Sequence, residues 1–213
     1  MEIYDARFKS SSVITVAGPS QSGKSTLVQN IVENRNDMFT EPISTVLWYC
    51  AYPPSKKLPG VVYKTGLPQF NMIQPHSLVV IDDFMQELRN SNELTSLMTK
   101  TVHHLPLSLI YITQNIFAKG SDNKTRRINT NYLIIFKNPH DKAQVEYIGR
   151  QMYPRDKNFL VSAFDAATNK SPYSYLLIDC HQETCDEIRV RTLITKNDDY
   201  IKVYVPHSIN LTA

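Results

Sequence analysis

The sequence of 213 residues predicts a three-layer α/β fold with a mainly parallel central sheet. Short apolar segments that favour strands alternate with segments of helical periodicity, and a glycine-containing loop joins the first strand to the first helix. A hydrophobic content of 42% and a charged content of 20% are typical of a globular protein. We expect one domain over residues 1–213, with a short strand-rich extension at about 180–213.

The first strand and the first helix are predicted within residues 13–32, VITVAGPSQSGKSTLVQNIV. The β-branched run at its start favours a strand, and the octapeptide GPSQSGKS that follows fits the phosphate-loop pattern G-x-x-x-x-G-K-[ST]. Glycine is needed at Gly18 and Gly23 because the backbone must turn tightly and approach phosphates, so that N–H groups and the helix N-terminus face the anion. The alternative is a Gly/Ser loop before an ordinary helix.

This motif predicts a site for a nucleoside triphosphate and Mg²⁺. Lys24 would neutralise the β- and γ-phosphates, and the Ser25 hydroxyl would ligate the metal ion. The residues expected to contact the nucleotide are Gly18, Pro19, Ser20, Gln21, Ser22, Gly23, Lys24, Ser25 and Thr26.

The remaining elements follow from apolar runs and from turn residues. Buried strands are predicted at 43–52, 77–84, 107–115 and 132–138, helices at 85–106 and 140–153, and strands at 173–179, 188–194 and 200–205. Residues 53–60 and 117–131 are expected to form loops, and the second of these is basic and polar.

Two carboxylates follow the strand predicted at 77–84. Asp82 and Asp83 emerge at the carboxyl end of that strand, which is the edge at which open α/β sheets bind ligands. We assign Asp82 to the magnesium side, through a water molecule, and Asp83 to the orientation or deprotonation of the attacking water. The alternative is an Asp pair that begins a turn.

An amide pair, Gln114 and Asn115, ends the strand predicted at 107–115. An amide hydrogen-bonds both a γ-phosphate and a water molecule without adding charge. We therefore predict that Gln114 senses hydrolysis and that Asn115 supports it. The alternative is a turn that terminates the strand.

The order of these motifs resembles the additional-strand ATPases, the division that contains RecA-like, AAA+ and FtsK–HerA motors. Within that division, residues 12–179 resemble the genome-packaging ATPases of double-stranded DNA viruses and Polinton-type elements, relatives of the poxvirus packaging ATPase. The segments that carry the resemblance are AGPSQSGKST, LVVIDDFM, HHLPLSLIYITQNIF, NTNYLIIFKNPHDKAQVEYIGRQMYP and SPYSYLLID. Asp83 stands where many related motors carry Glu, so the assignment of the base departs from the family pattern.

The resemblance implies an ATP-hydrolysing motor that drives double-stranded viral DNA into a preformed capsid, with ATP and Mg²⁺ as cofactors. It implies a homo-oligomeric ring, a pentamer or a hexamer, with capsid vertex proteins as partners, in the host-cell interior (cytoplasm or nucleus) at assembling virions. Two other classes stay open. A small-molecule or nucleoside kinase would phosphorylate an acceptor, and a nucleotide-gated switch would bind ATP with negligible turnover.

A motor of this kind needs a cation on the γ-phosphate in the transition state. Arg126 and Arg127 lie in the basic loop before a core strand, and a neighbouring subunit would supply one of them in trans, with Arg89 as a weaker alternative. The alternatives for the same loop are a solvated basic segment and a contact to DNA phosphates. The candidates for DNA contact are Lys56, Lys57, Lys119 and Lys124.

Charge and hydropathy limit the partners and the cellular locations that we expect. A net charge of +3 permits a nucleic-acid partner without requiring one. No apolar run approaches the roughly 18 residues of a membrane-spanning helix, and the N-terminal residues have no apolar signal core, so we expect neither stable membrane insertion nor secretion.

Cysteines and histidines offer little evidence of a metal centre. Three cysteines fit a reduced compartment better than a disulfide framework. Cys180, His181 and Cys185 have half of a metal-site pattern without a second pair at ligand spacing, which favours a structural role. For His103 and His104 we expect capping or packing.

Overall fold

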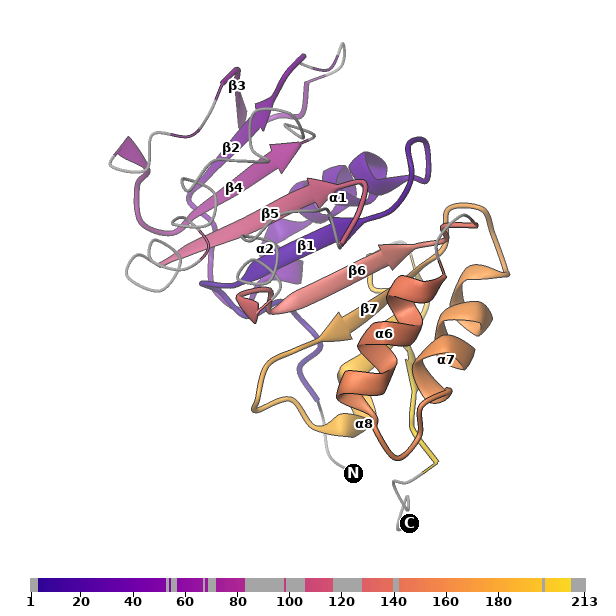
Figure 1. Ribbon diagram of the computed structural model, residues 1–213. Coiled ribbons are helices and arrows are strands. Elements are labelled where there is room, and N and C mark those ends of the chain that lie inside the picture. Colours follow the sequence, from indigo (N-terminus) through magenta and orange to yellow (C-terminus); the bar gives the residue numbers. More distant parts are fainter. Residues whose placement is uncertain are drawn as a thin grey trace.

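The computed structural model describes residues 4–207 except 53, 55–56, 67, 69–71, 83–97, 99–105, 117–127, 140–141 and 197. The described residues form a nine-stranded sheet in the order β3-β2-β4-β5-β1-β6-β7-β8-β9 (Figure 1). Its strands are β1 Val13–Ala17, β2 Thr45–Cys50, β3 Val61–Lys64, β4 Ser77–Asp82, β5 Leu107–Thr113, β6 Tyr132–Phe136, β7 Tyr175–Asp179, β8 Val190–Thr192 and β9 Lys202–Tyr204.

All strand pairs from β3 across to β6 are parallel, and the pairs β6–β7, β7–β8 and β8–β9 are antiparallel. The strands β1, β5 and β6 are buried along their whole length, as expected for parallel strands covered on both faces. The predicted α/β fold with a mainly parallel central sheet is therefore confirmed.

Helices cover both faces of the sheet. Among the described residues the helices are α1 Lys24–Glu33, α2 Arg35–Met38, α6 Ala143–Met152, α7 Phe159–Thr168 and α8 Asp186–Arg189. Figure 1 shows α1 and α2 behind the sheet and α6 and α7 in front of it. Alternate residues of β6 follow this division, because Ile134 packs in the core beneath α1 whereas Leu133 and Ile135 pack beneath α6 and α7. The three layers follow from this arrangement.

The strand β5 lies between β1 and β4, and this order brings three strand ends together. Ala17 at the end of β1 is paired with Thr113 at the end of β5. Asp82 at the end of β4 is paired with Ile112 of β5. The carboxyl ends of the three strands therefore meet at one edge of the sheet, which is where ligands bind in open α/β folds.

Four elements were not predicted from the sequence, namely α2, α7, α8 and β3. The helix α7 buries Phe159, Leu160, Ala163 and Phe164, and this spacing is a helical signal that the sequence contains. The strand β3 has only four residues, at the edge of the sheet, and alternating half-buried and exposed side chains. Most of the helix predicted at 85–106 and of the loop predicted at 117–131 lies outside the described residues.

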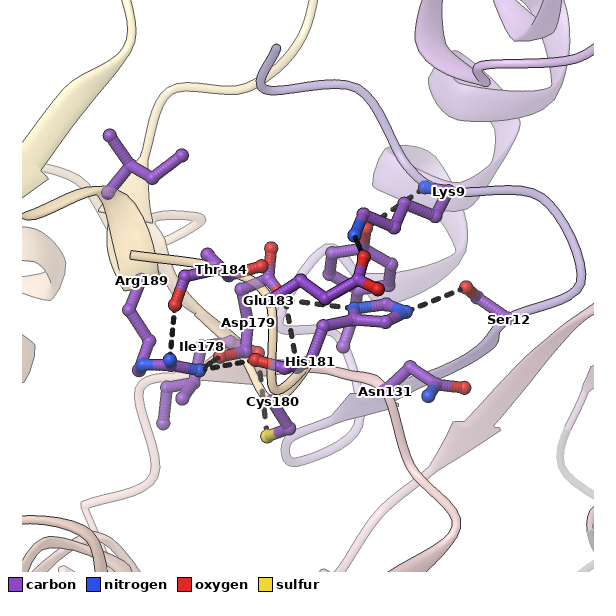
Figure 2. A network of polar contacts seen from close by, with 12 residues as sticks. Lys9, Ser12, Asn131, Ile178, Asp179, Cys180, His181, Glu183, Thr184 and Arg189 are labelled. Carbon is purple, nitrogen blue, oxygen red and sulfur yellow. Dashed lines mark hydrogen bonds and ion pairs between the residues drawn. The ribbon is translucent and has the colours of Figure 1, made fainter. Parts of the chain in front are cut away.

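A polar network ties the segment before β1 to the end of β7 (Figure 2). The Ser12 hydroxyl and His181 Nε2 share a hydrogen bond of 3.2 Å, and His181 Nδ1 lies 3.0 Å from Asp179 Oδ1. The other oxygen of the buried Asp179 accepts from Arg191 Nη1 at 3.2 Å. The His181 ring also packs on Tyr132. His181 therefore has a structural role here, and within the described ranges no group of three or more His, Cys, Asp or Glu side chains is placed to hold a metal ion.

This network predicts a loss of stability in acid. Burial raises the pKa of the Asp179 carboxyl, but the hydrogen bond from His181 and the charge of Arg191 outweigh burial and hold the pKa below its usual value. A carboxylate whose pKa is depressed in the folded state stabilises the fold above its unfolded pKa of about 3.9. We expect this contribution to be lost as the pH falls below about 4, as urea unfolding between pH 7 and pH 3 would measure.

Asp179→Asn tests the same network. The variant leaves the charge of Arg191 buried without its counterion, so we expect the free energy of unfolding at pH 7 to fall by about 3–5 kcal/mol. Its stability should also depend less on pH between 5 and 3. Asp5→Asn is the matched control, because Asp5 pairs with Arg7 at the surface. Equal losses in the two variants would contradict the role given to Asp179.

Candidate nucleotide site

The loop between β1 and α1 has a backbone that requires glycine at two positions. A Cβ atom at Gly18 would lie 2.6 Å from Cβ of Phe136, which is too close for any side chain. Gly23 has a φ of 101°, in the left-handed region that favours glycine. The N–H of Gly18 donates to the carbonyl of Thr113 at 3.2 Å and ties the loop to the end of β5.

The N-terminus of α1 is suited to an anion. Its first turn contains no acidic residue, and the N–H groups of a helix N-terminus and the helix dipole favour negative charge. The Lys24 ammonium donates to the carbonyl of Pro19 at 2.8 Å, so the cation lies across the loop that the helix follows. The loop, the helix end and Lys24 together fit the phosphate groups of a nucleotide.

Oxygen donors from two elements meet beside this loop. The Ser25 hydroxyl in the first turn of α1 donates to Asp82 Oδ2 at the end of β4, at 3.4 Å. Hydroxyl and carboxylate oxygens are the hard ligands that Mg²⁺ prefers, and the ion usually retains several waters. The residues present fit a magnesium ion held by Ser25 directly and by Asp82 through a water molecule.

The predicted sensor pair follows β5. The Thr113 hydroxyl donates to the carbonyl of Asn115 at 3.2 Å, which turns the chain directly after the strand. Gln114 is exposed and shares the lining of a small cavity with Gly18, Asn138 and other residues at the end of β6. The fold therefore places Gln114 beside the phosphate loop.

Several polar and aromatic residues of this region were not predicted from the sequence as part of the site. Gln144, in the first turn of α6, is buried, and its side-chain oxygen accepts from the N–H of Ile116 at 3.3 Å. A glutamine among the apolar positions of a predicted helix is the signal that would have found it. Tyr173 and Thr195 line a cleft beside α1. The phosphate-loop pattern contains no signal for them, because they come from the far end of the chain.

The structure describes only some of the other predicted site residues. Lys57 is exposed, in the loop between β2 and β3. The residues that lie outside the described part of the chain, and whose roles stay predictions, are Lys56, Asp83, Arg89, His103, His104, Lys119, Lys124, Arg126 and Arg127. Over the described ranges, every helix is too short or too polar to cross a membrane.

No protein-family model matches the chain, and no curated protein matches it. Solved structures do match. The crystal structure of B204, the DNA-packaging ATPase of Sulfolobus turreted icosahedral virus, aligns with a TM-score of 0.51 and 12% identity over 92% of this chain and 98% of B204.

The genome-packaging NTPase B204 of Sulfolobus turreted icosahedral virus 2 aligns at 13% identity, over 92% of this chain and 97% of B204. Its TM-score is 0.52 in the complex with AMPPCP and 0.55 in the complex with ATP-gammaS. At such low identity the alignment establishes the fold. The chain has the α/β fold of these P-loop NTPases, with its mainly parallel central sheet.

Proposed function

We propose that the chain is an ATP-hydrolysing motor that translocates double-stranded viral DNA into a preformed capsid. The observation that carries the proposal is the contact between Ser25 and Asp82 beside the phosphate loop. The strand β5, which Gln114 follows, lies between β1 and β4. In this proposal the phosphate loop is the phosphate cradle, the Ser25–Asp82 pair is the magnesium anchor and Gln114 is the sensor, all at one sheet edge. Support for the DNA-packaging role comes from B204, which is described as a packaging ATPase and shares the fold over almost the whole chain.

Each residue has one role in the proposed reaction. ATP, when bound with Mg²⁺, supplies the phosphoanhydride bond that is cleaved. Lys24 neutralises charge on the phosphates, and Ser25 and Asp82 hold the metal ion. Asp83 orients the attacking water and accepts its proton, and Gln114 hydrogen-bonds the same water.

The positive charge needed in the transition state comes, in this proposal, from a neighbouring subunit through Arg126 or Arg127. Hydrolysis is then confined to an assembled homo-oligomeric ring, a pentamer or a hexamer. Duplex DNA passes along basic side chains that contact phosphates without reading bases, namely Lys56, Lys57, Lys119 and Lys124. Capsid vertex proteins anchor the ring at assembling virions inside the host cell.

The rate of ATP hydrolysis with and without long duplex DNA, measured alongside the mass of the protein in solution, tests this function. We expect duplex DNA to stimulate turnover by the oligomer, and the stimulation to weaken as salt rises because counterions are released on binding. Phosphorylation of a small-molecule acceptor would instead indicate a kinase. ATP binding with negligible turnover, indifferent to DNA, would indicate a switch.

Asp83→Asn separates the two carboxylate roles. We expect the variant to bind ATP and Mg²⁺ normally while hydrolysis falls by roughly 10² or more, because the amide keeps the shape of the side chain and removes the base. Equilibrium binding of Mg·ATP and single-turnover hydrolysis, with Asp82→Asn measured in parallel, provide the comparison. Loss of binding in Asp83→Asn but not in Asp82→Asn would exchange the two assignments.

A further inference from the structure

A cleft of about 540 Å³ runs along the first turns of α1 and opens onto the phosphate loop. Gly23, Lys24 and Ser25 line its phosphate end, and Leu27 and Asn30 line it farther along α1. Its size lies in the range of small-molecule sites. Because phosphates at the α1 N-terminus and the cleft share these residues, the rest of a bound nucleotide has a direct path into the cleft.

We propose that this cleft binds the purine base of the nucleotide and that Tyr173 is the residue on which the base stacks. The inference rests on the proposed function, since it assumes that the phosphate loop holds a triphosphate. It adds a role for the C-terminal part of the chain, which has no part in the phosphate-loop motif.

Tyr173 is an aromatic side chain that lies beside the phosphate loop and is open to solvent. Tyr173 is 64% exposed to solvent. Its ring nevertheless packs on Gly23, since a Cβ atom there would lie 3.3 Å from Cδ1 of Tyr173. The part of the ring that does not contact the loop therefore remains available to a planar ligand in the cleft.

The backbone at Tyr173 is held in a turn. The N–H of Ser174 donates to the carbonyl of Ser171 at 3.2 Å, which closes a turn with Pro172 at its second position. The N–H of Tyr173 lies 3.4 Å from the Ser171 hydroxyl. A fixed backbone limits the positions that the ring can take, so less conformational entropy is lost when a base stacks on it.

A rigid wall from the C-terminal segment forms another side of the cleft. The buried Tyr175 accepts a hydrogen bond from the N–H of Ile194 at 3.1 Å, which fixes the loop that follows β8. Thr195, which lines the cleft, donates through its N–H and its hydroxyl to Asp198 Oδ2 at 2.9 Å and 2.6 Å. The cleft is therefore preformed.

The charge of the lining indicates the chemistry of the ligand. Among the described residues that line the cleft, only Lys24 is charged, and it lies at the phosphate end. The remaining lining is aromatic, aliphatic or neutral and polar, with Asn30 and Thr195 as polar neighbours for a base edge. A neutral heteroaromatic base suits this lining, and a purine offers more stacking area than a pyrimidine.

Binding of ATP compared with binding of inorganic tripolyphosphate, each with Mg²⁺, isolates the contribution of the base. Tyr173→Ala should weaken ATP binding by about 5- to 100-fold, as expected for the loss of one base–aromatic stack, and should change tripolyphosphate binding by less than about twofold. Unchanged tripolyphosphate binding excludes a folding defect as the cause. Tyr173→Phe should bind ATP like the wild type, because it keeps the ring. The wild-type preference for ATP over UTP should shrink in Tyr173→Ala.

Tyr200→Ala is the matched control, because Tyr200 is 59% exposed and does not line the cleft. The inference is overturned if Tyr173→Ala leaves ATP binding unchanged or weakens ATP and tripolyphosphate equally, since the ring would then act only on the loop. Lys24→Ala distinguishes failure of the proposed function. If that variant binds both ligands as the wild type does, the phosphate loop is not the triphosphate site, whatever the result for Tyr173→Ala.

Discussion

Lys24→Ala is expected to abolish ATP turnover and to leave the fold intact. The variant removes the ammonium that neutralises the β- and γ-phosphates, a charge-assisted contact for which the chain offers no substitute in the phosphate loop. The helix should persist, because Lys24 is the first residue of α1 and Ala is a good helix former. Steady-state ATPase assays and thermal unfolding by circular dichroism measure the two effects.

Lys142→Ala is a suitable control for that experiment. Lys142 pairs with Asp165 on an exposed surface between α6 and α7, so its loss should leave turnover unchanged. Near-normal ATPase activity in Lys24→Ala would refute the assignment of the phosphate site. Unfolding of the variant would show that the loop needs Lys24 for its own structure, through the bond to Pro19.

Arg126→Ala or Arg127→Ala is expected to cut turnover by roughly 10³ to 10⁵ while ATP affinity stays nearly unchanged. The effect should belong to one of the two arginines, the one that reaches the γ-phosphate of a neighbour. Its size follows from the stabilisation that such a cation gives to charge in the transition state only. Single-turnover hydrolysis and equilibrium ATP binding, measured on both variants, test the prediction.

Mixing variants tests whether the arginine acts between subunits. An arginine variant combined with Lys24→Ala should recover some activity, because an intact phosphate site on one chain meets an intact arginine on the next. The mass of the mixed rings must first be shown to equal that of the wild type. Wild-type rates in both arginine variants, or no recovery in well-assembled mixtures, would indicate that this loop is a solvated basic segment without a role in hydrolysis.

The parts of the fold that the sequence predicts are those with strong local patterns. The strands β1, β4, β5 and β6 are nearly continuous apolar runs because they are covered on both faces, and each was predicted close to its observed bounds. The phosphate loop and α1 follow from a motif with required glycines. No strand order was predicted, and so the position of β5 between β1 and β4 was not either, because periodicity contains no information on strand order.

The site was predictable only where its residues share a motif. Ser25 and Asp82 were predicted to act together, and the fold brings them within 3.4 Å. The cleft wall was not predicted, because Tyr173 and Thr195 reach α1 only through the antiparallel strands that follow β6. Contacts between such distant segments depend on tertiary packing, which leaves no local pattern in the sequence.

Displacement of a third strand from a duplex is the most direct test of DNA translocation. Assembled rings would be given ATP and Mg²⁺ on linear duplexes that carry a short triplex at increasing distances from the end. The proposed motor predicts ATP-dependent displacement after a lag that grows in proportion to that distance, and no displacement by Lys24→Ala rings. DNA-stimulated hydrolysis without displacement, or with a lag independent of distance, would contradict translocation.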